Sequence, residues 1–317
     1  MQPKHLGIVW NPSKTTREEL EQALDSASLT SSSMHVDWFE TSEDDPGRAA
    51  TRRAVEAGAS VILAAGGDGT VRAVAEHLAE TGAPAELAII PLGTGNLLAR
   101  NLNVPLNDRQ AAFQRALTGT GKPLDIGWVQ VDLPSGQERY AFAVMAGFGI
   151  DAHMISETDD DLKSKAGWLA YVESLGRAIS ASEVIEVRLA IDDAEAEPAR
   201  AHTIIIGNCG TLQGGVTLLP DADPADGKLD LLALHEDGVA GWAGTLSTMV
   251  WDNGLKRLLS KERGDEAAVS DGTTTHRQIS SVSIELDEAR AFEVDGDEVG
   301  EVTRLEVHVQ PAAIRVR

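Results

Sequence analysis

The chain has 317 residues, enough for two domains that each bury a core. Its formal net charge of −23 leaves too few clustered cations to hold a phosphate backbone, so we expect no nucleic-acid partner. A single cysteine, Cys209, excludes a disulfide framework and fits a reducing compartment. Because no secretory signal pattern follows Met1 and no apolar run approaches the roughly 20 residues that span a bilayer, we expect a cytoplasmic protein.

The first part of the chain alternates short apolar runs with amphipathic helical patterns. Strand patterns occupy 6–10, 34–39, 61–65 and 87–90, and helical patterns follow them at 16–27, 46–57, 70–80 and 96–102. A further short helix is expected after Pro105. This alternation predicts a parallel α/β domain, to which we assign residues 1–124.

Two glycine-rich loops follow consecutive strands of this domain. The first is Gly66-Gly67-Asp68-Gly69-Thr70, and the second, after Pro91, is Gly93-Thr94-Gly95-Asn96. Each precedes a helical pattern, so backbone N–H groups and the positive end of a helix dipole face the carboxyl edge of the sheet, as phosphate binding requires. Asp68 would repel phosphate unless a divalent cation lay between them, which indicates Mg²⁺. A plain tight turn is the alternative for either loop alone, but their repetition favours a metal–nucleotide site.

From Asp125 onwards the pattern changes to short segments that often alternate apolar and polar residues. Strands are expected at 126–132, 139–148, 184–191, 202–208, 229–235, 280–286, 291–295 and 303–309. Helical patterns are confined to 165–181 and 239–262, and 264–277 is expected to be an exposed loop. We therefore expect a β-rich second domain, residues 125–317, with the active site in the cleft between the domains and a C-terminus free to pack back on the first.

Asp295-Gly296-Asp297 is the candidate for proton transfer. On an extended strand, residues i and i+2 face the same side, so both carboxylates would point one way. One could accept a hydroxyl proton while the other orients the hydroxyl or binds metal. The alternative is an ordinary hairpin turn, which Asp-Gly commonly forms.

Several motifs in a fixed order resemble the diacylglycerol kinase catalytic-domain family, which includes bacterial soluble lipid kinases and sphingosine kinases. They are GGDGT (66–70), PLGTGN (91–96), LDIG (124–127), GFGID (147–151), KSKAGWLAY (163–171), IGN (206–208), PDADPADGKLD (220–230) and VDGD (294–297). GGDGT alone is shared with NAD kinases and phosphofructokinases. The ordered series is specific for the lipid-kinase branch.

The resemblance implies an ATP- and magnesium-dependent transferase that phosphorylates a lipid hydroxyl, of diacylglycerol or a sphingoid-like base, in phospholipid metabolism. It implies nucleotide contacts, beyond the two glycine loops, from Asn11, Pro12, Ser13 and Thr41. Asp125 would join Asp68 at magnesium through water. A second metal loop would use the Asp226 side chain with backbone carbonyls of Asp223 and Lys228.

Two departures from the family pattern keep other functions open. Leu97 stands where diacylglycerol kinases commonly have Asp, and Asp297 replaces a Glu, so either Asp295 or Asp297 could be the base. An NAD kinase-like enzyme and a nucleotide-binding regulator without turnover are the alternatives.

One segment offers a route by which so acidic a chain could reach a lipid. Residues 242–263 combine Trp251, Leu255, Leu258 and Leu259 at helical spacing with four cations, which predicts transient contact with the inner membrane face. An amphipathic helix packed on the second domain is the alternative. Whether the chain forms a homodimer stays open.

Overall fold

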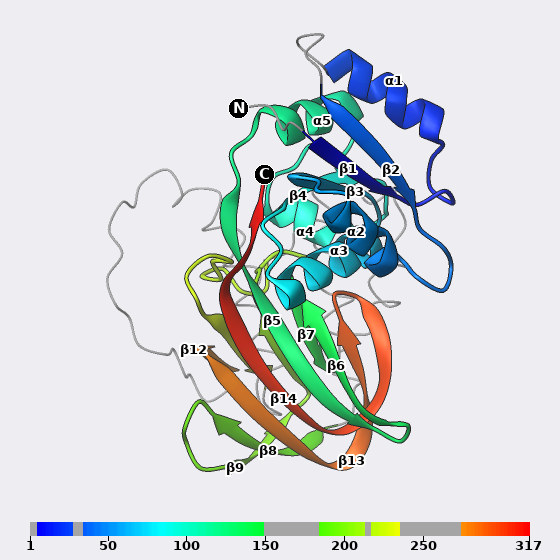
Figure 1. Ribbon diagram of the computed structural model, residues 1–317. Coiled ribbons are helices and arrows are strands. Elements are labelled where there is room, and N and C mark those ends of the chain that lie inside the picture. The colour runs from blue at the N-terminus through cyan, green and yellow to red at the C-terminus, as the bar shows by residue number, and fades with distance from the viewer. Residues whose placement is uncertain (1–4, 28–33, 149–183, 213–216, 235–273) are drawn as a thin grey trace, which may run out of the picture.

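The computed structural model describes residues 5–27, 34–148, 184–212, 217–234 and 274–317. Two domains follow one another along the molecule, and Figure 1 shows helices only around the first of them in the described part of the chain. The fourteen strands of the described residues join one continuous hydrogen-bonded network. The expected parallel α/β domain followed by a β-rich domain is confirmed.

The first domain is a four-stranded parallel sheet in the order β4-β3-β1-β2. Its elements are β1 (His5–Trp10), α1 (Arg17–Ala27), β2 (His35–Glu40), α2 (Arg48–Glu56), β3 (Val61–Gly66), α3 (Asp68–Thr81), β4 (Glu86–Pro91), α4 (Leu97–Asn101) and α5 (Arg109–Thr118). Every residue of β3 is buried, because helices cover both faces of a parallel sheet. This is why these strands form unbroken apolar runs in the sequence.

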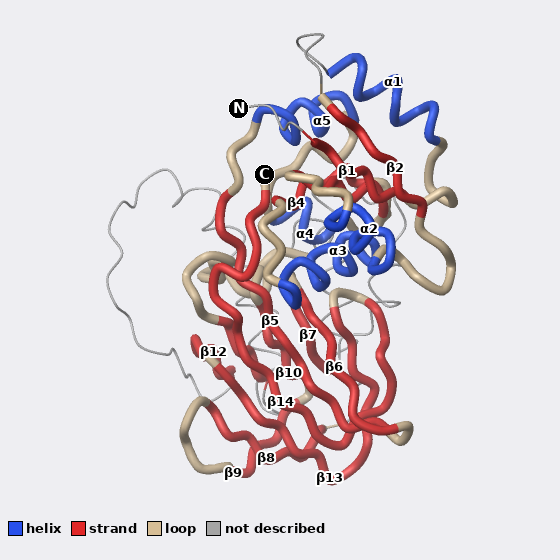
Figure 2. The backbone as a smooth tube through the Cα atoms, in the orientation of Figure 1, coloured by secondary structure: helices blue, strands red, loops and turns tan. Residues whose placement is uncertain are grey.

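The second domain is built from antiparallel strands. Its elements are β5 (Lys122–Leu133), β6 (Gly136–Phe142), β7 (Met145–Phe148), β8 (Ile185–Ile191), β9 (Glu197–Ala201), β10 (Thr203–Gly207), β11 (Leu229–Leu234), β12 (Thr274–Ile279), β13 (Ser281–Val294) and β14 (Asp297–Val316). Figure 2 shows the long strands of this domain below the helices. Its core is a separate apolar cluster that includes Phe142, Phe148 and Phe292.

Two long strands cross from one domain to the other. β14 pairs with β5 from Arg304↔Asp132 to Val316↔Lys122, and Val316 also pairs in parallel with Leu87 of β4. The last residue continues this contact, since Arg317 N–H donates to Leu87 O at 2.9 Å. The C-terminus therefore lies against the first domain (Figure 1), and the division at residue 124 falls inside β5.

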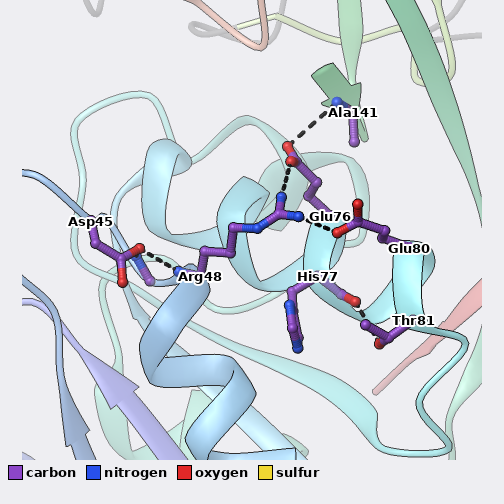
Figure 3. Close-up of polar contacts among 8 residues, drawn as sticks. Asp45, Arg48, Glu76, His77, Glu80, Thr81 and Ala141 are labelled. Carbon is purple, nitrogen blue, oxygen red and sulfur yellow. Dashed lines mark hydrogen bonds and ion pairs between the residues drawn. The ribbon is translucent and has the colours of Figure 1, made fainter. Parts of the chain in front are cut away.

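A polar network also joins the domains near the end of β6. The Arg48 guanidinium of α2 contacts Glu76 of α3 at 2.6 Å and also Glu80. The other Glu76 oxygen accepts from the N–H of Ala141 in β6 at 3.4 Å, and Figure 3 shows Glu76 between the two. The Asp45 carboxylate accepts from the Arg48 N–H in the first turn of α2 at 2.7 Å.

Some expected elements differ in the structure or lie outside its described residues. The expectation of a loop over 264–277 is wrong at its C-terminal end, because Thr274–Ile279 forms strand β12. The β-branched residues of β12 favour a strand, and β12 pairs with β11. The expected strand 139–148 is interrupted between β6 and β7, and the two strands expected at 280–286 and 291–295 form a single strand, β13 (Ser281–Val294), with a register shift after Glu285. The helices expected at 165–181 and 239–262, with the membrane-contact segment 242–263, lie outside the described residues. Cys209 is buried in the core.

Candidate active site

The two glycine loops lie against each other at the carboxyl ends of β3 and β4. Leu92 N–H donates to Gly66 O at 2.8 Å, which holds the loops together. A Cβ atom on Gly93 would lie 2.7 Å from the Cα of Gly67, closer than atoms can approach. Glycine is therefore required for the loops to pack together and to present their backbone N–H groups at one place.

Asp68 binds the second loop with its carboxylate. Its two oxygens accept from the N–H groups of Asn96 at 2.8 Å and Leu97 at 2.6 Å, where α4 begins. Burial raises the pKa of Asp68, and the nearby Asp297 charge raises it further, while these N–H groups oppose the shift. The carboxylates of Asp68 and Asp297 are thus close enough for their charges to interact. Their hard oxygen donors fit Mg²⁺.

Asp295 and Gly296 form the two-residue turn between β13 and β14. Both have positive φ, +50° and +86°, and Val294 pairs with Asp297 across them, which is the pattern of a type I′ hairpin. The expectation that Asp295 and Asp297 share one face of an extended strand is therefore wrong. The turn sends the two carboxylates to different partners.

The Asp295 carboxylate points into the protein. It accepts from three consecutive N–H groups, of Ala143 at 2.9 Å, Val144 at 2.9 Å and Met145 at 3.0 Å. These three residues lie where strand β6 ends and strand β7 begins. The Asp295 residue is 6% exposed, and burial raises its pKa to about 6 although the three N–H groups favour the charged form.

Asp297 turns outward and meets α3. Its Oδ2 lies 2.7 Å from a guanidinium nitrogen of Arg72, and a Cβ on Gly69 would lie 3.6 Å from the same oxygen. The Arg72 side chain is 17% exposed, and its Nε has no hydrogen-bond partner among the described residues. The hairpin turn of the second domain therefore sits at the first turn of the helix that follows the glycine loop.

A cavity of about 460 Å³ opens between these elements. Its polar lining includes the glycine loops, the hairpin turn and two glutamates: Gly67, Asp68, Gly69, Gly93, Thr94, Gly95, Glu293, Asp295, Gly296, Asp297 and Glu298. Its apolar lining includes Leu97, Met145, Ala146, Phe148, Ile205 and Leu212. One cavity can thus hold a charged group and an apolar one next to each other.

Lys14 also lines this cavity, although sequence reasoning did not select it. It belongs to the loop after β1, in which Asn11 Oδ1 accepts from the Ser13 N–H at 2.9 Å and its hydroxyl at 2.8 Å. The available signal was a lysine three residues beyond Asn11, at the same sheet edge as the glycine loops. Arg72 was missed as well, because its partner is 225 residues away.

Thr41 lies at the same edge, at the carboxyl end of β2. Its N–H donates to Trp10 O at 3.0 Å, whereas its buried hydroxyl has no hydrogen-bond partner in the described part of the chain. A buried hydroxyl without a partner is costly, so a ligand group at this edge would satisfy it. Neither Thr41 nor Asn11 is among the residues that line the cavity.

Asp125 lies with the second candidate metal loop and is not among the residues that line the cavity. Its buried carboxylate accepts from Gly227 N–H at 2.7 Å and Ala312 N–H at 2.6 Å. In that loop Asp226 accepts from Lys228 N–H at 2.9 Å. Burial and the charges of Asp223 and Asp230 raise the pKa of Asp226. Carboxylate oxygens suit a hard cation, but no three acidic side chains of this loop converge among the described residues.

Comparison with known proteins identifies both domains. Residues 5–129 match the family described as "Diacylglycerol kinase catalytic domain", and residues 144–317 match "YegS C-terminal NAD kinase beta sandwich-like domain". A "Probable lipid kinase YegS-like" of Pseudomonas aeruginosa is 32% identical over 279 residues, covering 87% of this chain and 82% of that protein. A "Diacylglycerol kinase" of Mycobacterium tuberculosis is 30% identical over 184 residues, 58% of each chain.

A solved structure shares the fold over the whole chain. It is a putative diacylglycerol kinase from Bacillus anthracis str. Sterne, with a TM-score of 0.72 and 20% sequence identity. The match covers 100% of this chain and 97% of that one. At this identity the similarity establishes the fold alone.

Proposed function

Since this chain belongs to the diacylglycerol kinase catalytic-domain family, as its motifs predicted, we propose that it is an ATP-dependent lipid kinase whose central cavity transfers the γ-phosphoryl group to a lipid hydroxyl. The observation that carries this proposal is the meeting of three elements at one cavity. The two glycine loops offer N–H groups for phosphate, and the hairpin turn brings Asp295 to the same space. Phosphoryl transfer needs this combination of positioning, charge neutralisation and a proton acceptor.

ATP and Mg²⁺ would contact the polar lining residues of the cavity. The glycine loops would cradle the phosphates together with Lys14, and Asn11, Pro12, Ser13 and Thr41 would hold the nucleotide at the same sheet edge. Asp68 and Asp297 would supply oxygen ligands to Mg²⁺, which neutralises phosphate charge when bound. Asp125, with Asp223, Asp226 and the Lys228 carbonyl, would belong to a second cation site.

Asp295 is the better candidate for the proton acceptor, and Asp297 for a positioning role. A carboxyl with a pKa of about 6 is mostly ionised at neutral pH and yet basic enough to accept a proton during transfer. The Asp297 carboxylate is held by the Arg72 guanidinium at 2.7 Å, which suits it to fixing the position of the hairpin turn.

The apolar lining residues of the cavity support a lipid acceptor. Met145, Phe148, Ile205 and Leu212 would contact the hydrocarbon beside the reacting hydroxyl. Diacylglycerol and a sphingoid-like base both fit this description, and either reaction would belong to phospholipid or related lipid metabolism.

NAD kinase activity is the alternative with a specific observation, because the matched C-terminal family is itself named for its NAD kinase-like β-sandwich. A regulator that binds nucleotide without turnover is the other alternative. The test is ATP consumption by the purified chain with diacylglycerol or sphingosine in mixed micelles, and with NAD as acceptor. Turnover on a lipid and not on NAD is expected. Turnover on NAD alone, or none with any acceptor despite ATP binding, would overturn the proposal.

Access to the lipid is a separate question. None of the described helices is long and apolar enough to cross a membrane. We propose transient contact with the inner membrane face through residues 242–263. Salt-sensitive co-sedimentation with anionic vesicles, weakened in Lys256→Glu/Arg257→Glu, is the expected result, and equal sedimentation of variant and parent would remove this role.

A further inference from the structure

A cluster of two histidines and one aspartate lies at the opposite end of the first domain from the cavity. His5 begins β1 and His35 begins β2, and the two are register partners, as are Gly7 and Asp37. In parallel strands, register partners and residues two positions apart face the same side of the sheet. His5, His35 and Asp37 therefore share one face at the amino ends of these strands.

Their potential ligand atoms already converge. Asp37 Oδ2 lies 2.9 Å from His5 Nε2 and 3.2 Å from His35 Nε2, and the imidazole centroids are 4.5 Å apart. A tetrahedral zinc ion with Zn–N and Zn–O bonds of about 2.0–2.1 Å has ligands about 3.3 Å apart. The observed separations match that geometry closely enough that small side-chain rotations would admit the ion. Among the described residues, no other group of three histidine, cysteine or acidic side chains is gathered this way.

The chemistry of the set favours a transition metal over Mg²⁺. Two imidazoles with one carboxylate suit Zn²⁺ and related divalent ions, whereas Mg²⁺ prefers oxygen ligands. The exposed fraction of the side chain rises from 16% for His5 to 35% for Asp37 and 65% for His35. The ion would thus have an anchored inner side and a solvent side where water completes the coordination. In the described part of the chain the ion pairs of Asp37 involve only these two imidazoles.

We propose that His5, His35 and Asp37 form a binding site for Zn²⁺ or a similar divalent transition metal that fastens β2 to β1. β2 is the last strand at its end of the sheet, paired only with β1 among the described strands, so a metal bridge would add a cross-link where pairing is one-sided. The glycine loops follow the other ends of strands parallel to β1. β1 has six residues, each spanning about 3.3 Å, so the metal would lie roughly 20 Å from the glycine loops. Its role would therefore be structural.

The experiment is equilibrium binding of Zn²⁺ to the full chain, produced without a histidine tag and kept in excess Mg²⁺ to fill oxygen-rich sites. Co²⁺ is the spectroscopic probe, because nitrogen and oxygen ligands in tetrahedral geometry give it visible absorption. One tight Zn²⁺ per chain is expected, with a rise in melting temperature on binding. His35→Ala and Asp37→Asn should each weaken binding by about 10-fold or more, since even outer-shell changes at metal sites cost that much.

His308→Ala is the matched control, because His308 is an exposed histidine on β14 outside the cluster. It should bind Zn²⁺ like the parent. Absence of Zn²⁺ binding in excess Mg²⁺, or equal affinity in parent, His35→Ala and Asp37→Asn, would overturn the proposal. A correctly folded His35→Ala chain is checked by its unchanged melting temperature without metal, because this side chain is mostly exposed.

Discussion

Arg72 of α3 and Asp297 of the hairpin turn form an ion pair at 2.7 Å although they are 225 positions apart in the chain. The first belongs to the helix after the glycine loop, and the second begins the long strand that crosses both domains. This pair therefore fixes the distance between the candidate phosphate loops and the candidate proton acceptor, Asp295. At a site of group transfer, a small displacement of a reacting group lowers the reaction rate more than it lowers the stability of the fold.

We predict that Arg72→Met lowers turnover by about 10-fold or more while changing stability by about 1 kcal/mol or less. Losing the pair lets the hairpin turn shift, whereas ion pairs with a half-exposed partner contribute little to folding. Steady-state kinetics and thermal unfolding of the variant measure the two effects. Arg304→Met is the control, because its acidic partners, Glu285 and Glu306, lie on β13 and β14 and are not among the cavity-lining residues. Equal activity of both variants would contradict the positioning role.

We predict that Asp295→Asn slows turnover by about 10²–10⁴-fold with little change in ATP affinity, the usual cost of removing a general base. Asp192→Asn is a closely matched control. Asp192 also has positive φ, +52°, and its carboxylate accepts from two backbone N–H groups, of Ser280 at 2.7 Å and Ser281 at 3.0 Å. If both variants lose turnover alike, the effect comes from a disturbed turn and not from proton transfer.

The pH dependence of the rate should report the same carboxyl. Because Asp295 must be ionised to accept a proton and its pKa is about 6, turnover should rise through about pH 6 and level off above it. The contribution of Asp295 to the stability of the fold changes with pH in the opposite direction. A carboxyl whose folded pKa is raised favours the folded state most below the unfolded value near 4, and this contribution is lost as pH rises through about 6. Rates from about pH 5 to 8, with unfolding of parent and Asp295→Asn from about pH 4 to 8, test both statements. A rate limb that persists unchanged in Asp295→Asn would assign it to another group.

The features of the fold and the site that could be predicted from the sequence are those set by residues close together in the chain. The glycine loops and parallel strands were predictable, because periodicity and loop chemistry are local and strands such as 61–65 are buried on both faces. The return of Val316 to Leu87 and the three N–H groups that bind Asp295 were not, since they join residues 150 or more positions apart. Asp295 itself shows the limit clearly. Its Asp-Gly turn was recognised as an alternative, but whether its carboxylate points inward depends on the break between β6 and β7.

Asp68 should have a double effect, on folding and on catalysis. Asp68→Ala removes the acceptor for the Asn96 and Leu97 N–H groups and leaves the start of α4 uncapped, at a cost of about 1–2 kcal/mol. It should also abolish magnesium-dependent turnover, because an oxygen ligand for Mg²⁺ is lost. Asp68→Asn keeps one oxygen for the N–H groups and should recover part of the stability without the activity. Thermal unfolding with Mg²⁺-dependent kinetics separates the effects, and full activity of either variant would remove Asp68 from the site.

His77 of α3 provides a prediction away from the cavity. It is buried beside Arg48 (Figure 3), and its Nδ1 has no hydrogen-bond partner among the described residues. Burial, with the Arg48 charge as a second cause, lowers the pKa of His77. A histidine with a lowered folded pKa stabilises the fold above its unfolded value near 6.5, and this contribution is lost as pH falls through the folded pKa. His77→Gln should therefore flatten the decrease in melting temperature below about pH 6.5, relative to the parent.

His308→Gln is the control for this prediction. Burial also lowers the pKa of His308, but this residue is exposed, so the change in melting temperature should be smaller. A decrease as steep in His77→Gln as in the parent would assign the acid sensitivity to other groups.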